Sequence, residues 1–159
     1  MMISSGSPSS QALACDIAAL LEEKDPMGEN EDSDMTLRLS LLRSARSKKN
    51  LGRWARIAQI AQEYRKMLRI WEDNEPIDAE EVGHLIALAY PERIAHATDH
   101  AGNFKMSNGN TIFIDPCDSM AANEWLAIAS LNLASTSSSN SGQGRKGRVF
   151  LSAPVNWKN

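Results

Sequence analysis

Seven residues in the second half of the chain have the chemistry of a surface for single-stranded nucleic acid. They are Arg93, Phe104, Lys105, Asn108, Arg145, Lys146 and Arg148. Cations along strands and loops can follow the phosphates of a single strand, and a base can stack on an aromatic ring such as that of Phe104. The alternative is that Phe104 belongs to a hydrophobic core and that the basic residues are simply solvated. The residues alone leave both interpretations open.

The sequence contains no recognisable catalytic motif. It has no glycine-rich phosphate loop ending in Gly-Lys-Ser or Gly-Lys-Thr, and no Asp-Glu-Ala-His box that would hold magnesium. No Gly-x-Ser-x-Gly elbow places a serine as a nucleophile. His96 and His100 fall in a segment expected to be strand and turn, where their spacing does not put both rings on one helix face. We therefore predict no catalytic residue, and no ATP hydrolysis by this chain alone.

Metal, disulfide and membrane signals are also missing. Cys15 and Cys117 lie far apart outside any paired motif, and His84 has no second ligand at metal spacing, so no metal or resident cofactor is expected. Two unpaired thiols suit a reducing cytoplasm. No apolar run approaches the roughly 20 residues that span a bilayer. The N-terminus lacks a signal-peptide pattern. We expect a cytoplasmic protein that does not enter the membrane.

The charges are distributed unevenly along a chain whose net charge is only -3. Residues 22–34 are strongly acidic, whereas residues 38–69 carry ten cations and one acid, Glu63. Such a basic segment can form a surface that contacts phosphate, although an ordinary solvated face explains it equally well. The length of 159 residues fits one domain or two small ones, and 42% hydrophobic residues are typical of a soluble globular protein.

The first half of the chain has helical periodicity. After a disordered lead-in at 1–11, we predict helices over about 12–23, 34–48, 51–71 and 78–90, from the spacing of apolar residues and from the caps and breaks between them. In the third helix we place Met67 and Trp71 on the apolar face, with Arg65, Lys66 and Arg69 on the opposite side. Pro91 ends the last helix, because a proline disfavours helical geometry in the residue before it.

The second half of the chain has the pattern of short strands. We predict them at about 93–98, 103–107, 111–114, 124–133 and 147–153, with Asn108-Gly109 as a hairpin turn. The Ser- and Gly-rich segment 134–147 is expected to be a mobile loop. Five strands in this arrangement suit an OB-fold. The predicted fold class is α+β, with a helical domain at 12–90 followed by an OB-like β-barrel at 91–155.

Four segments carry a family resemblance. They are residues 85–95 (LIALAYPERIA), 103–109 (NFKMSNG), 118–126 (DSMAANEWL) and 147–154 (GRVFLSAP). Together they resemble the C-terminal region of the HrpB-type ATP-dependent helicases, a group of DEAH/RHA-like helicases. The resemblance spans roughly residues 12–155.

The resemblance implies a function as well as a fold. Residues 12–90 would correspond to a ratchet-like helical region and 91–155 to the OB-like domain, both downstream of the motor domains. The expected role is that of a non-catalytic accessory part that contacts single-stranded RNA or DNA together with the motor. ATP and magnesium would be bound by the motor domains. The alternative is a structural module that binds a protein and has no direct contact with nucleic acid.

Overall fold

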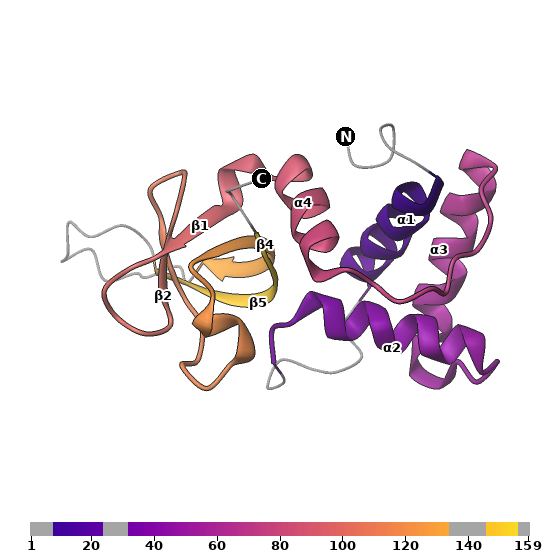
Figure 1. The fold of residues 1–159 in the computed structure, drawn as a ribbon, viewed down its shortest axis with the longest axis horizontal. Helices are drawn as coiled ribbons and strands as arrows, with labels where there is room; N and C mark the ends of the chain where they lie inside the picture. The colour runs from indigo at the N-terminus through magenta and orange to yellow at the C-terminus, as the bar shows by residue number, and fades with distance from the viewer. Residues whose placement is uncertain (1–7, 24–31, 134–145, 156–159) are drawn as a thin grey trace.

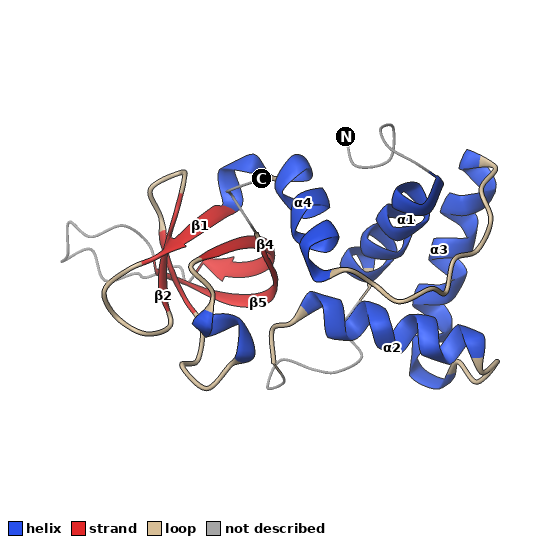
Figure 2. Cartoon of the chain, viewed as in Figure 1, coloured by secondary structure: helices blue, strands red, loops and turns tan. Residues whose placement is uncertain are grey.

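The computed structural model describes residues 8–23, 32–133 and 146–155. It contains the α-helices α1 (Pro8–Glu22), α2 (Met35–Ser47), α3 (Ala55–Leu68) and α4 (Ala79–Ala89), and the strands β1 (Ile94–Ala97), β2 (Asn103–Met106), β3 (Thr111–Phe113), β4 (Trp125–Leu133) and β5 (Lys146–Pro154). Short 3-10 helices span Gly52–Trp54, Pro91–Arg93 and Ser119–Ala122. The helices gather at one end of the molecule and the strands at the other (Figures 1 and 2).

The predicted fold class is confirmed: a helical bundle precedes a closed barrel of five strands in the order β1-β2-β3-β5-β4. Helix α1 begins at Pro8, inside the segment expected to be a disordered lead-in. Most of the predicted loop at 134–147 lies outside the described residues, and Lys146 and Gly147 already belong to β5. Among the helices of the described residues, none is both long and apolar enough to cross a membrane.

Polar caps and left-handed residues set the ends of the helices. Asp34 accepts hydrogen bonds from the backbone N–H groups of Thr36 and Leu37 at the start of α2, and Asp78 accepts one from Glu80 at the start of α4. Helix α3 ends at Leu68 rather than at the predicted Trp71, because Arg69 adopts a left-handed conformation with φ of 56°. The backbone N–H of Ile70 then bonds to the carbonyl of Arg65, which completes a Schellman turn.

The early end of α3 changes the surface. Met67, in the last turn of α3, is 77% exposed, and Trp71, which follows the end of the helix, is 91% exposed. Both residues were expected on the apolar face of a longer helix. The described structure instead presents them to solvent at the end of α3 and in the segment that follows it.

The barrel is closed by one parallel contact. Strands β3 and β5 pair in parallel, whereas every other neighbouring pair is antiparallel. The predicted hairpin between β2 and β3 is present, but its loop has three residues, closed by a bond from the N–H of Met106 to the carbonyl of Asn110. Of the two turn residues only Gly109 has a positive φ, 93°. The loop therefore uses one left-handed residue, which glycine supplies without strain.

Helix α4 packs directly on the barrel and joins the two halves. The helical core includes Ala127, Ala129, Leu151 and Ala153 from β4 and β5, while a second core fills the barrel interior. At the crossing, a Cβ atom on Gly83 would lie 1.9 Å from the carbonyl oxygen of Pro154. Only a glycine allows the helix backbone to approach the strand this closely. The outer face of β4 and β5 is therefore part of the helical core.

Candidate nucleic-acid interface and a buried arginine cluster

The structure brings only some of the seven predicted site residues together. Lys105 on β2 and Arg148 on β5 are exposed on the barrel. Asn108 is exposed in the β2–β3 loop, where its side-chain oxygen accepts a hydrogen bond from the N–H of Asn110 at 3.0 Å. Lys146 is the first residue of β5. Arg145 lies outside the described residues.

The side chain of Arg93 contacts the end of α4 and strand β4. Its guanidinium carbon lies 4.5 Å from the centre of the Tyr90 ring, in a cation–π contact. One of its terminal nitrogens donates to the carbonyl of Ala129 at 3.3 Å. Arg93 thus joins the end of α4 to strand β4, and its charge is partly engaged within the fold.

Phe104 is corrected from a stacking residue to a core residue. It is 0% exposed and lies in the barrel core, so no base can reach its ring. Phe104 pairs with Ile112, and both side chains point inward. The alternation of a strand then turns Phe113 outward, where it is 36% exposed. The pairing of two apolar residues across the Asn-Gly hairpin is the sequence signal that would have identified Phe113 as the exposed ring.

A row of polar and aromatic residues crosses the outside of the barrel. His96 on β1 lies opposite Trp125 on β4 and Lys105 on β2, and Lys105 lies opposite Thr111 on β3. The rings of His96 and Trp125 are stacked, with centroids 4.1 Å apart and an angle of 23° between their planes. His96 Nε2 also lies 3.4 Å from Glu124 Oε1. This row presents a cation next to a stacked ring pair.

A second pair extends this surface toward β5. Phe113 lies opposite Arg148 in the parallel pairing of β3 with β5. The guanidinium carbon of Arg148 also lies 5.8 Å from the ring centre of Phe150. We call the exposed side chains of His96, Lys105, Phe113 and Arg148 the barrel face. Cations and aromatic rings alternate on it, which is the composition of a surface for single-stranded nucleic acid.

The basic segment 38–69 does not form one solvated surface. Four of its arginines are buried, namely Arg38, Arg43, Arg46 and Arg65. Arg65 was predicted to face solvent, but it follows Ala61 by four residues and so lies on the buried face of α3. Arg38 instead donates to the carbonyl oxygens of Asp32 and Asp34 beside the start of α2. Only part of the segment's charge is therefore at the surface.

Three of these arginines surround the buried carboxylate of Asp16, which is 1% exposed. Arg46 binds both carboxylate oxygens, at 2.7 and 2.8 Å, and Arg43 Nε donates to Oδ2 at 3.1 Å. Arg65 Nη1 lies 3.7 Å from Oδ1, within ion-pair range but too far for a hydrogen bond. We call Asp16, Arg43, Arg46 and Arg65 the arginine cluster. Asp16 stands alone among apolar residues of α1, and this pattern is the sequence signal for a buried cation partner.

The arginine cluster is incompletely satisfied. Among the described residues, Arg43 Nη2 and Arg65 Nη1 are buried and have no hydrogen-bond partner. The pKa of Arg65 lies below its usual value, because burial and the nearby charge of Arg46 both disfavour a second cation. Apart from the shared carboxylate of Asp16, Arg43 Nη1 lies 3.7 Å from Asp73 Oδ1 and Arg65 Nη2 lies 3.4 Å from Glu72 Oε1, and both of these contacts are long.

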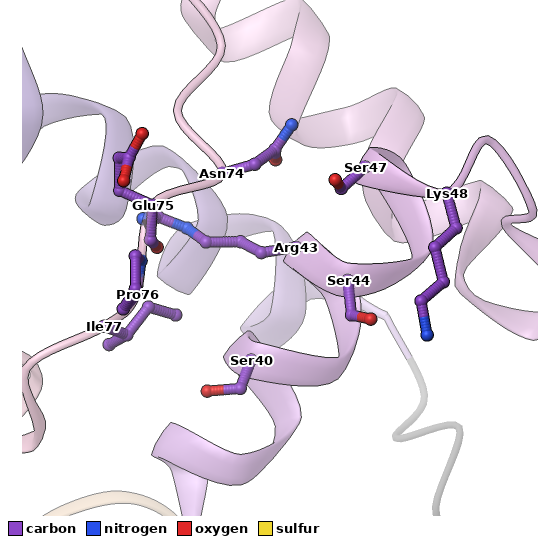
Figure 3. A pocket seen from close by; sticks show the side chains of 9 residues that line it. All are labelled: Ser40, Arg43, Ser44, Ser47, Lys48, Asn74, Glu75, Pro76 and Ile77. Carbon is purple, nitrogen blue, oxygen red and sulfur yellow. Dashed lines mark hydrogen bonds between the residues drawn. The ribbon is translucent and has the colours of Figure 1, made fainter.

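A pocket opens on each side of this cluster. The first, of about 230 Å³, lies between α2 and the segment before α4. Figure 3 shows Ser40, Ser44 and Ser47 along one side of α2, with Arg43 extending toward Glu75. Arg43 Nη1 donates to the Glu75 carbonyl at 2.9 Å. The second pocket, of about 320 Å³, lies between the end of α2 and α3 and is lined by Arg46 and Arg65.

Two carboxyl groups meet where the segment before α2 reaches the barrel. Asp32 accepts hydrogen bonds from the N–H and hydroxyl of Ser119, and Asp118 accepts from the N–H groups of Ser33 and Met120. Burial and the hydrogen bond to Asp32 raise the pKa of Asp118. Burial also acts to raise the pKa of Asp32, but the hydrogen bonds from Asp118 and Ser119 outweigh it and hold that pKa below its usual value.

Neither thiols nor acids form a metal centre in the described part of the chain. No group of three or more His, Cys, Asp or Glu side chains gathers there in an arrangement that could hold a metal ion. Cys15 is buried and free, and Cys117 is exposed and free. Burial and the charge of Asp16 raise the pKa of the Cys15 thiol, with an opposing effect from Arg65.

Comparison with known proteins identifies what this architecture is similar to. No protein-family model matches the sequence. The ATP-dependent RNA helicase HrpB of Escherichia coli strain K12 is 30% identical to the chain over 138 residues, which are 87% of this chain and 15% of that protein. The chain resembles a small segment of HrpB. The resemblance expected from the sequence is therefore confirmed.

Solved structures of HrpB agree with this likeness in fold. A crystal structure of the E. coli DExH-box NTPase HrpB matches 98% of the chain with a TM-score of 0.73 and 24% identity. A second, described as the E. coli DEAH/RHA helicase HrpB, matches 99% with a TM-score of 0.71 and 20% identity. The chain spans only 16% and 17% of those two chains. The helices and the barrel therefore correspond in arrangement to one part of a much larger HrpB molecule.

Proposed function

We propose that this chain is a non-catalytic accessory part of an HrpB-type ATP-dependent helicase and that it contacts single-stranded nucleic acid through the barrel face. The observation that carries the proposal is the alternation of cations and rings across neighbouring strands, from His96 through Lys105 to Phe113 and Arg148. Lysine and arginine would follow the phosphates, and the exposed rings would stack on bases. The likeness to an RNA helicase supports nucleic acid as the ligand.

In this proposal the chemistry of ATP belongs to other domains. The sequence lacks the phosphate loop and the acidic box that bind ATP and magnesium in helicase motors. The motor domains of the same helicase would supply both, and they are the partner we propose for the chain. Its own part would be to hold the strand beside the motor in the cytoplasm.

Charge reversal on the barrel face tests the proposal. We expect the double variant Lys105→Glu/Arg148→Glu to bind a fluorescein-labelled single-stranded RNA at least about tenfold more weakly than wild type, because two phosphate contacts become repulsions. Phe113→Ala should weaken binding without changing its salt dependence, because it removes stacking rather than charge. Fluorescence anisotropy measures both.

The control for this experiment is Lys66→Glu on α3, which is the same charge reversal at an exposed site far from the barrel face. It should retain binding within about twofold of wild type. Equal loss of binding in Lys66→Glu and in the barrel-face variants would mean that only net charge matters, and would contradict the proposed interface.

The second candidate function is protein interaction without direct contact to nucleic acid. It is favoured by the exposure of Met67 and Trp71, two large apolar side chains four residues apart, because a contiguous exposed apolar patch marks a protein interaction site. The occupant would be a motor segment of the same helicase. If Met67→Ser/Trp71→Ser abolishes pull-down of a separately expressed motor segment while the barrel-face variants do not change RNA binding, this second function replaces the first.

A further inference from the structure

The pocket between the end of α2 and α3 has the lining of an anion site. It measures about 320 Å³, and the polar part of its lining consists of Arg46, Lys49, Gln59, Gln62, Arg65 and Glu72. Three cations line it against one acid. Asp16, behind the pocket, is already bound by Arg46 and Arg43. The positive charge at the pocket is therefore not fully compensated within the protein.

Arg65 supplies the main unsatisfied donor. Its side chain is only 7% exposed, and its Nη1 has no hydrogen-bond partner among the described residues. A second contact of Arg65, from Nη2 to Glu72 Oε1, is long at 3.4 Å and involves a side chain that is 47% exposed. A buried donor without an acceptor is costly, so an incoming anion would satisfy a group that the fold leaves open.

Other donors line the same pocket. Lys49 is exposed and carries an ammonium group. Gln59 accepts a hydrogen bond from Arg56 with its side-chain oxygen, which leaves its amide N–H groups for a ligand, and Gln62 adds a second amide. Donors from one guanidinium, one ammonium and two amides match the several acceptor oxygens of a phosphate better than the two of a carboxylate. The apolar side of the pocket is formed by Leu51, Ala55 and Ala58, and it would contact the part of the ligand that bears the phosphate.

We propose that this pocket binds a phosphate group, carried either by a small nucleotide or by a nucleic-acid backbone. The site lies on the helices and not on the barrel face, so it goes beyond the function proposed above and does not depend on it. Arg65 and Lys49 would neutralise the phosphate, and Glu72 would be displaced from Arg65 as the ligand enters. The volume of about 320 Å³ exceeds the need of a phosphate alone and admits an attached sugar or base.

The test follows the side-chain Nε–H signal of Arg65 in nitrogen-15 NMR spectra of the whole chain, assigned by its loss in Arg65→Lys. The chain is titrated with inorganic phosphate, with adenosine monophosphate and with a single-stranded RNA hexamer, using sodium chloride at equal ionic strength as the reference. We expect a saturable shift with the phosphate compounds and none with chloride. Tighter binding of the mononucleotide or of the hexamer identifies the source of the phosphate.

Two variants that leave the arginine cluster intact give opposite expectations. Gln62→Glu places a carboxylate in the pocket and should weaken phosphate binding at least about tenfold, whereas Glu72→Gln removes one and should strengthen it several-fold. Lys66→Glu, on the same helix but outside the pocket, should leave the affinity within about twofold of wild type. The barrel-face variant Lys105→Glu/Arg148→Glu should retain the Arg65 shift with inorganic phosphate, which separates this site from the barrel face.

The absence of a saturable Arg65 shift with all three phosphate compounds would overturn the proposal. So would an equal loss of affinity in Gln62→Glu and Lys66→Glu, because a general charge effect would then explain the binding. If Glu72→Gln binds phosphate more weakly than wild type, Glu72 is not a competitor for Arg65 and the site is not an anion pocket.

Discussion

Asp16 places a buried negative charge among the helices. A single buried carboxylate receives three hydrogen bonds from Arg43 and Arg46 and an ion pair from Arg65. Buried ion pairs add little net stability, because removing both charges from water costs about as much as their attraction returns. The loss of one partner is different, since it leaves the others charged, buried and uncompensated.

We therefore expect Asp16→Asn to lower the free energy of unfolding by about 3–5 kcal/mol. The three guanidinium groups would repel one another without the carboxylate. Urea denaturation followed by circular dichroism measures the change. Glu63→Gln, an exposed acid-to-amide change on α3, serves as the control and should stay within about 0.5 kcal/mol of wild type. A loss below about 1 kcal/mol in Asp16→Asn would contradict the role assigned to the cluster.

The Asp32–Asp118 pair predicts a pH effect. Because the folded-state pKa of Asp118 is raised, its contribution to stability is present below the ordinary pKa of 3.8 and is lost as the pH rises through the raised value. The pKa of Asp32 is lowered, so its contribution is present at neutral pH and is lost as the pH falls through its folded-state pKa. The contributions of Asp118 and Asp32 to the free energy of unfolding therefore overlap only at acidic pH.

Asp32→Asn should return the pKa of Asp118 toward its ordinary value, because the amide removes the charge that shares the proton. Titration of the carboxyl carbon signals by carbon-13 NMR measures this pKa directly. The stability of the variant should also fall less than that of wild type as the pH rises through the raised pKa of Asp118. An unchanged titration of Asp118 in the variant would show that burial alone causes its shift.

At the level of elements, the left-handed end of α3 is strained. Arg69 has φ of 56°, a conformation that L-residues with side chains adopt at a cost and that glycine adopts readily. We expect Arg69→Gly to raise the free energy of unfolding by about 0.5–1 kcal/mol. Lys66→Gly, inside the same helix, should lower it by a similar amount. Thermal denaturation of both variants should therefore give shifts of opposite sign, and shifts of the same sign would exclude this explanation of the helix end.

The contact between α4 and β5 depends on one glycine. Ala at position 83 would place its Cβ against the carbonyl oxygen of Pro154, and neither backbone can move without separating the helix from the barrel. We expect Gly83→Ala to destabilise the protein by about 2 kcal/mol or more, as overpacking does in a close-packed core. His84→Ala, at the next and exposed position, is the control. If Gly83→Ala leaves the stability of the protein nearly unchanged, α4 can shift on the barrel to accept the added Cβ atom.

The elements themselves could be predicted from local patterns, but their partners could not. Apolar spacing, the caps at Asp34 and Asp78 and the Asn-Gly turn place the helices and the β2–β3 hairpin near their observed positions. The spacing from Ala61 places Arg65 on the buried face of α3, but its charge partner Asp16 lies almost fifty residues earlier and could not be predicted from local patterns. The Asn-Gly hairpin pairs Phe104 with Ile112, and this pairing assigns Phe104 to the core and Phe113 to the surface, but we did not apply it to the two rings.

Across the whole molecule, the helices and the barrel share one core. Residues of β4 and β5 pack with those of α1, α2, α3 and α4. A substitution at this junction should therefore change the packing of both the helices and the barrel. The barrel face lies on β1, β2, β3 and β5, and its residues are not part of the helical core. The shared core thus joins the helices to the barrel that carries this face.

The salt dependence of RNA binding tests the central claim most directly. A labelled single-stranded RNA, and the same sequence as DNA, would be titrated with the wild-type chain in fluorescence anisotropy at low and at physiological salt. The proposed function predicts binding at low salt that weakens steeply as salt rises, because phosphate contacts release counterions. Failure to bind either strand at low salt would contradict an intrinsic nucleic-acid surface and would leave protein interaction through Met67 and Trp71 as the function of the chain.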